Sequence, residues 1–118
     1  PLDQGILLDK FDPANPPKFD EGDYRTSRKD FNADTLHQVR EKIGQIKKRF
    51  GVSAASGTDG CTASLSSIAS RWVLAHDHVC STIPGFRNAA QARCNVLAGS
   101  DAPLTPADVE FCRKLFGK

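Results

Sequence analysis

Only one stretch of this 118-residue chain has the composition of a β-strand. The run Val79–Ile83 contains three β-branched residues and is closed by Pro84 and Gly85, which is typical of a short buried strand. A lone strand cannot form a sheet, because its backbone donors and acceptors need partners on both sides. The sequence therefore predicts a mainly α-helical chain with one short β-strand, a fold that is incomplete on its own.

The other apolar residues follow helical spacing in four segments. The clearest pattern runs from about Asp34 to Gly51, with apolar side chains three and four residues apart on one face: Leu36, Val39, Ile43 and Ile46. Further helices are predicted over about 64–76 and over about 88–97. A last helix is predicted to begin at Pro106, where the preceding Thr105 can cap the first turn.

The rest of the sequence is interpreted as two loops within a single unit, residues 1–118. Residues 1–33 hold four of the seven prolines and few apolar side chains, which predicts a long loop. Loops of this length in compact domains are usually either functional or disordered. Residues 53–63 are small and polar, and they predict a second, flexible loop.

Charge, hydropathy and cysteine spacing exclude several classes of protein. Sixteen basic and fourteen acidic residues leave a net charge of +2, which is too weak for the strongly basic face of a nucleic-acid-binding protein. No apolar run is long enough to span a bilayer, and the start of the chain lacks the pattern of a signal peptide. The four cysteines are irregularly spaced, so we interpret them as reduced, mostly buried cysteines of a cytoplasmic protein.

The string His76-x-His78-x-Cys80 offers side chains of the kinds that zinc binds. A structural zinc site normally needs four ligands, and no fourth ligand is close in the sequence. We therefore predict no metal site here and interpret the string as a polar corner between a helix and the strand.

Two motifs resemble the aldo/keto reductase family. From Ile83 the chain reads Ile-Pro-Gly-x-Arg, then Gln four residues on and Asn four residues beyond, which is similar to the family's eighth strand-to-helix junction. The segment Pro1–Lys10 is similar to the loop after strand seven, usually Pro-Leu-x-x-Gly-x-Leu-Thr-Gly-Lys. The resemblance covers nearly the whole chain and implies the C-terminal part of a (β/α)8 barrel, since a complete barrel needs about 250 residues.

The resemblance implies that the chain binds NADP(H). The complete family members are oxidoreductases that transfer hydride between NADPH and a carbonyl compound. The family's positions for the adenosine half of the cofactor correspond to four residues of the second motif: Gly85, Arg87, Gln91 and Asn95. The positions near the pyrophosphate correspond to three residues of the first motif: Leu2, Gly5 and Lys10.

These residue types suit the chemistry of a nucleotide tail. The N-terminus of a helix favours a phosphate through its unpaired N–H groups and its dipole. Gly85 has no side chain, so a ligand can approach the backbone closely. The planar, permanently charged guanidinium of Arg87 suits a 2′-phosphate. Gln91 and Asn95 follow at successive turns on the same helix face, where their amides can add neutral hydrogen bonds.

The same residues also have simpler interpretations. Arg87, Gln91 and Asn95 could form a solvated helix face, and Lys10 could be an ordinary surface lysine. The basic segment Arg25–Lys29 could reach a cofactor phosphate or could be a solvated loop. Asp9 stands where the family has Gly, and it is expected to add a carboxylate beside the pyrophosphate contact.

No catalytic residue is predicted for this chain. The family's catalytic Asp, Tyr, Lys and His belong to strands one to four and the loops nearby, and Tyr24 and the lysines here match none of those motifs. The uncovered strand and helix faces predict either a homo-oligomer or cover by a barrel segment that precedes this one. The alternative function is therefore that of a non-catalytic, self-associating helical protein derived from a truncated reductase.

Overall fold

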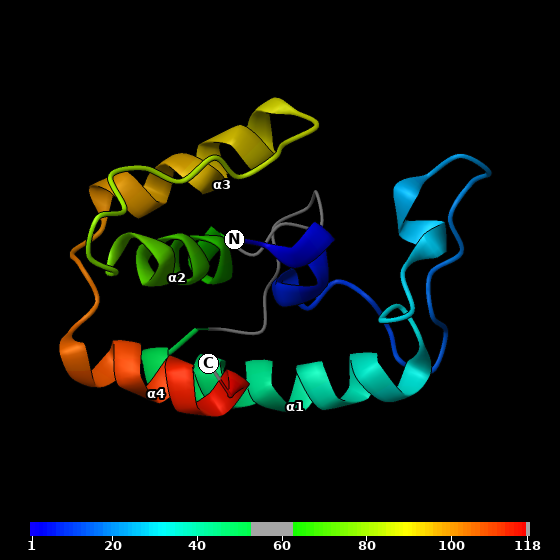
Figure 1. Ribbon diagram of the computed structural model, residues 1–118, viewed down its shortest axis with the longest axis horizontal. Helices are drawn as coiled ribbons and strands as arrows, with labels where there is room; N and C mark the ends of the chain where they lie inside the picture. Colours follow the sequence, from blue (N-terminus) through cyan, green and yellow to red (C-terminus); the bar gives the residue numbers. More distant parts are fainter. Residues whose placement is uncertain (53–62, 118) are drawn as a thin grey trace.

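The computed structural model describes residues 1–52 and 63–117 and is mainly helical (Figure 1). In chain order the described elements are the 3-10 helices η1 (Asp3–Leu8) and η2 (Tyr24–Ser27) and the α-helices α1 (Ala33–Phe50), α2 (Ala63–Leu74), α3 (Ala89–Ser100) and α4 (Pro106–Phe116). Helix α2 packs against α3 and η1, and α1 packs against η1 and α4. The mainly α-helical fold class is confirmed. The loop predicted over 53–63 falls almost entirely outside the described residues.

Helix α1 follows its sequence pattern closely. The Asn32 side chain caps it by accepting a hydrogen bond of 2.9 Å from the backbone N–H of Thr35. Gly51 ends it in the left-handed conformation, with φ of 64°, as a glycine without a Cβ allows. Its apolar face buries Leu36, Ile43 and Ile46. The predicted boundaries and the predicted core face of this helix are both confirmed.

Helices α2 and α3 meet through small side chains. Ser66, Ser67 and Ser70 of α2 are almost completely buried. The Ser67 hydroxyl donates to the Asp101 carboxylate, and the Ser66 hydroxyl donates to Asn95 Oδ1 at 2.9 Å. Because no bulky residue separates the two helices, such short side chains reach across the contact. Helix α2 ends at Leu74, two residues earlier than predicted, and α3 extends to Ser100.

Helix α4 closes the other side of the apolar core. The Thr105 side chain caps it, and Pro106 occupies the first turn, as the sequence predicts. The indole N–H of Trp72 on α2 donates to the backbone oxygen of Val109 at 3.2 Å. The central cluster of buried side chains comes from η1, α1, α2 and α4: Leu8, Ile43, Ile46, Leu65, Ile68 and Cys112.

Residues 1–33 contain more structure than the predicted loop. They include η1 and η2, and they bury Ile6 and Phe31 against Leu36 of α1. Phe11, Phe19 and Phe31 pack edge to face, with ring centroids 4.9 Å apart for Phe19 and Phe31. The prolines prevent regular helix here, but the aromatic side chains still hold this segment against the helical core.

The predicted strand at Val79–Ile83 is wrong. This segment forms no β-ladder, and within the described residues β-pairing is limited to an isolated bridge between Asp12 and Asn15. The Ile83 side chain, which was expected to be buried, is 93% exposed. A β-branched run becomes a strand only when neighbouring strands pair with its backbone and cover its side chains, and no described segment does so.

The described residues form no barrel, so the resemblance to part of a (β/α)8 barrel stays a prediction. None of the described helices has both the length and the apolar character that crossing a bilayer requires.

Candidate cofactor-binding site

A polar cavity of about 530 Å³ lies where η1, the segment 83–87 and the start of α3 meet. Its lining includes every residue that the sequence predicts for the cofactor: Leu2, Gly5, Lys10, Gly85, Arg87, Gln91 and Asn95. The two motifs lie at opposite ends of the chain, and the fold brings them to one space. Convergence of this kind is what the cofactor interpretation requires.

The wall formed by η1 has an unusual backbone. Asp3, Gln4 and Gly5 have positive φ angles of 46°, 55° and 92°, a conformation that costs about 1–2 kcal/mol for each residue with a Cβ. A Cβ at Gly5 would lie 2.5 Å from Lys10 Cε, so the absence of a side chain lets Lys10 cross over this turn. Strained backbone of this kind is concentrated at ligand-binding sites.

The Asp9 carboxylate does not line the polar cavity. The carboxylate instead accepts hydrogen bonds from Lys47 Nζ at 2.6 Å and Arg40 Nε at 3.1 Å, both on α1. Asp9 has φ of 54°, and a short polar side chain tolerates this left-handed conformation better than most. Asp9 therefore accommodates the turn, and its charge is paired with α1 and not at the cavity wall.

The N-terminus of α3 is held by local hydrogen bonds. The Asn88 side chain accepts from the backbone N–H of Gln91 at 2.9 Å, and Gln91 Oε1 accepts from the backbone N–H of Arg87 at 2.8 Å. This reciprocal arrangement resembles a capping box. It fixes the direction in which the chain enters the helix, and the Arg87 side chain lies exposed at the cavity wall.

Asn95 connects the cavity wall to the helices behind it. Its Nδ2 donates to the backbone oxygens of Gly85 at 3.2 Å and Pro84 at 3.4 Å, and its Oδ1 accepts from Ser66. The side-chain amide of Asn95, which was expected to add a hydrogen bond to the cofactor, is thus bonded within the protein. In this arrangement it holds the backbone of Gly85 in place.

Arg25 also lines the cavity, from the segment that we call the Asp23 loop (residues 20–30). It donates to the Asp23 carboxylate at 2.5 and 2.9 Å, and its guanidinium lies 4.1 Å from the centroid of the Phe19 ring. These bonds hold the pKa of Asp23 far below its usual value of 3.8, and the nearby charge of Arg87 lowers it further. Within the basic segment, Arg25 is thus a residue of the cavity lining, and contact with a cofactor phosphate stays a prediction.

Arg28 fastens the Asp23 loop to η1. Its guanidinium donates to Asp3 at 2.9 Å and also to Asp30 within the loop. The two carboxylates raise the pKa of Arg28 above its already high value. The charged hydrogen bond from Arg28 to Asp3 therefore joins the Asp23 loop to η1.

Several lining residues were not predicted from the sequence. They share a position directly beside motif residues in the chain: Pro1, Asp3, Gln4, Leu8, Ile83 and Phe86. Adjacency to a motif was the one signal that could have identified them, because their side-chain types vary from apolar to acidic.

The cysteine interpretation needs correction. Of the cysteines in the described part of the chain, Cys112 is buried, Cys94 is half-buried and Cys80 is exposed, and all are free thiols. Cys80 is exposed because the segment that carries it forms no strand. The described residues contain no group of three His, Cys, Asp or Glu side chains that could hold a metal ion, the string from His76 to Cys80 included.

Comparisons with models of protein families, with curated proteins and with solved structures gave no match to this chain.

We predict that Gly5→Ala lowers the stability of the protein by at least about 1–2 kcal/mol, because alanine at φ of 92° is strained and its Cβ meets Lys10. Gly44→Ala is the matched control, since Gly44 lies within α1 with open space around it and alanine there should raise stability by about 0.5–1 kcal/mol. Chemical denaturation measures both changes. Equal effects of the two substitutions would contradict the role given to the η1 turn.

A second prediction concerns the ionisation of Asp23. Its folded-state pKa is depressed, so the stabilisation from its pairing is complete above about pH 4 and is lost as the pH falls through the folded pKa. Carbon-detected NMR of the carboxyl group should show a midpoint well below 3.8 that returns toward it in Arg25→Ala. Lys29→Ala, which removes a charge from the same loop, should leave the midpoint low. A normal midpoint in the unsubstituted protein would rule out the pairing.

Proposed function

We propose that this chain is the NADP(H)-binding, C-terminal part of an aldo/keto reductase-like oxidoreductase. The observation that carries the proposal is the meeting of both motifs around one polar cavity, which includes all the residues named from the resemblance. A pocket of a few hundred cubic ångströms with a small number of convergent polar groups is the usual form of a cofactor site.

The charge of the cavity supports an anionic ligand. Lys10, Arg25 and Arg87 line it, and Asp3 is the one carboxylate among its described lining residues. The charge of Asp3 is offset by its hydrogen bond with Arg28. Arg25 is itself paired with Asp23, so the attraction for a phosphate group rests mainly on Arg87, whose planar fork suits a terminal phosphate better than a lysine does.

The residues of this chain would bind and orient the nucleotide. In a complete reductase, bound NADPH supplies the hydride for reduction of a carbonyl compound. Gly5 and Gly85 would allow close approach to the backbone, Lys10 and Arg25 would meet phosphate groups, and Arg87 would distinguish NADP(H) from NAD(H). The chain matches no catalytic motif of the family, so we propose that it is inactive alone.

The test is titration of the purified chain with NADPH and with NADH. NADPH should bind more tightly, and Arg87→Ala should weaken NADPH binding by about ten- to a hundredfold, because a hydrogen bond to a charged group contributes about 1.5–3 kcal/mol. NADH binding should change little. Arg93→Ala is the control, since Arg93 is an exposed arginine of α3 that does not line the cavity. Equal affinity for the two cofactors would refute the role of Arg87.

The second candidate is a non-catalytic protein that self-associates. It is favoured by large apolar side chains exposed near α3: Ile83 at 93%, Phe86 at 65% and Val96 at 68%. Monomeric proteins rarely leave neighbouring apolar groups uncovered, and a second copy of the chain could cover them.

Sedimentation analysis separates the two candidates. Self-association predicts an oligomer that dissociates on Ile83→Ser, with Thr82→Ser as a control that keeps the apolar surface nearly unchanged. A monomer with a sharp thermal transition and with NADPH binding would instead favour the cofactor-binding function.

A further inference from the structure

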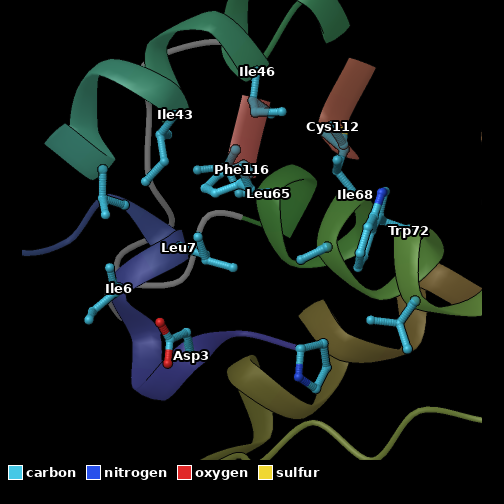
Figure 2. A pocket seen from close by; sticks show the side chains of 14 residues that line it. Asp3, Ile6, Leu7, Ile43, Ile46, Leu65, Ile68, Trp72, Cys112 and Phe116 are labelled. Carbon is cyan, nitrogen blue, oxygen red and sulfur yellow. The ribbon is translucent and has the colours of Figure 1, made fainter. Parts of the chain in front are cut away.

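A second, apolar cavity of about 520 Å³ lies between η1, α1, α2 and α4 (Figure 2). We propose that it binds a small, uncharged apolar molecule that carries one hydrogen-bond donor, such as an aromatic alcohol. The proposal does not depend on the proposed nucleotide site, with which this cavity shares Pro1 and Asp3 in its lining.

The walls of this cavity are made of buried aliphatic side chains. Ile6, Ile43, Ile46, Leu65 and Ile68 line it, and all are at most 6% exposed. Figure 2 shows their side chains arranged around one space, with the Trp72 ring along the wall formed by α2. Protein interiors leave few voids larger than a water molecule, and water needs polar partners, so an apolar space of this size suits an apolar ligand.

The shape of the apolar lining favours a small molecule over a protein as the occupant of this cavity. A partner protein needs apolar side chains that project from the surface. The large exposed apolar residues of the described chain lie elsewhere, and none of them lines this cavity: Tyr24, Ile83, Phe86, Val96 and Leu97. The lining is recessed, so its occupant must be small enough to enter between the helices.

Asp3 supplies a hydrogen-bond acceptor to the apolar cavity, so the proposed ligand carries its hydrogen-bond donor at that end. Its carboxylate lies at the edge of the cavity, away from Cys112 and Ile46 in Figure 2, and its Oδ1 accepts from Arg28. A carboxylate can accept further hydrogen bonds, so a ligand hydroxyl suits this position, whereas a ligand carboxylate would bury a charge among aliphatic walls. Cys112 lies among the apolar walls, and burial raises the pKa of its thiol, so this side chain stays neutral.

Ligand binding can be measured through the fluorescence of Trp72, because it is the one tryptophan in the chain and it lines the cavity. Bromine quenches tryptophan fluorescence on contact, so 4-bromobenzyl alcohol should give saturable quenching that unlabelled benzyl alcohol reverses by competition. The anionic 4-bromobenzoate should quench at least about tenfold more weakly at the same concentration, because the apolar walls cannot solvate its carboxylate.

A cavity-filling substitution tests the location. Ala69→Leu places a larger side chain into the lining and should weaken binding of 4-bromobenzyl alcohol by about tenfold or more. Ala107→Leu is the control, since Ala107 is exposed on α4 and outside the cavity, and it should bind normally. Circular dichroism confirms that each variant is folded. If Ala69→Leu does not fold, competition by benzyl alcohol in the unsubstituted protein decides.

Three results would overturn the proposal. The first is quenching that rises linearly and equally for the alcohol and the benzoate. The second is unchanged binding in folded Ala69→Leu. The third is a dimer that shows no quenching, which would assign the cavity to a second copy. Arg87→Ala separates this proposal from the nucleotide site, because it should weaken NADPH binding and leave the quenching unchanged.

Discussion

The side-chain amide of Asn95 is the contact on which the polar cavity depends. It accepts a hydrogen bond from Ser66 of α2 and donates to the backbone oxygens of Pro84 and Gly85. The segment before α3 has no β-ladder to hold it, so this one side chain performs the positioning that a neighbouring strand would perform in a sheet. The contact is possible because small serines let α2 and α3 approach closely.

The η1 turn separates two cavities of opposite character. The polar cavity is lined by the basic residues Lys10, Arg25 and Arg87. The apolar cavity is lined by aliphatic residues of α1 and α2. Asp3 belongs to both linings, and Arg28 holds it in place.

The helices were predictable because their signals are local. Apolar spacing and caps identified α1, and Thr105 with Pro106 marked the start of α4. The strand prediction failed because a strand is defined by its partners, and the β-branched residues of 79–83 carry no information about whether partners exist. The cysteine interpretation failed for the same reason, since Cys80 lies in that uncovered segment.

The sequence by itself determined the four α-helices to within a few residues, because caps and periodicity act locally. The residues of the two motifs were named from the family resemblance. Only the tertiary structure decided that both motifs line one cavity, that Arg25 joins them, and that Asp9 faces α1 instead. It also decided that Asn95 holds the backbone of Gly85. These outcomes depend on which distant side chains compete for each hydrogen bond, and that competition is settled only when the helices have packed.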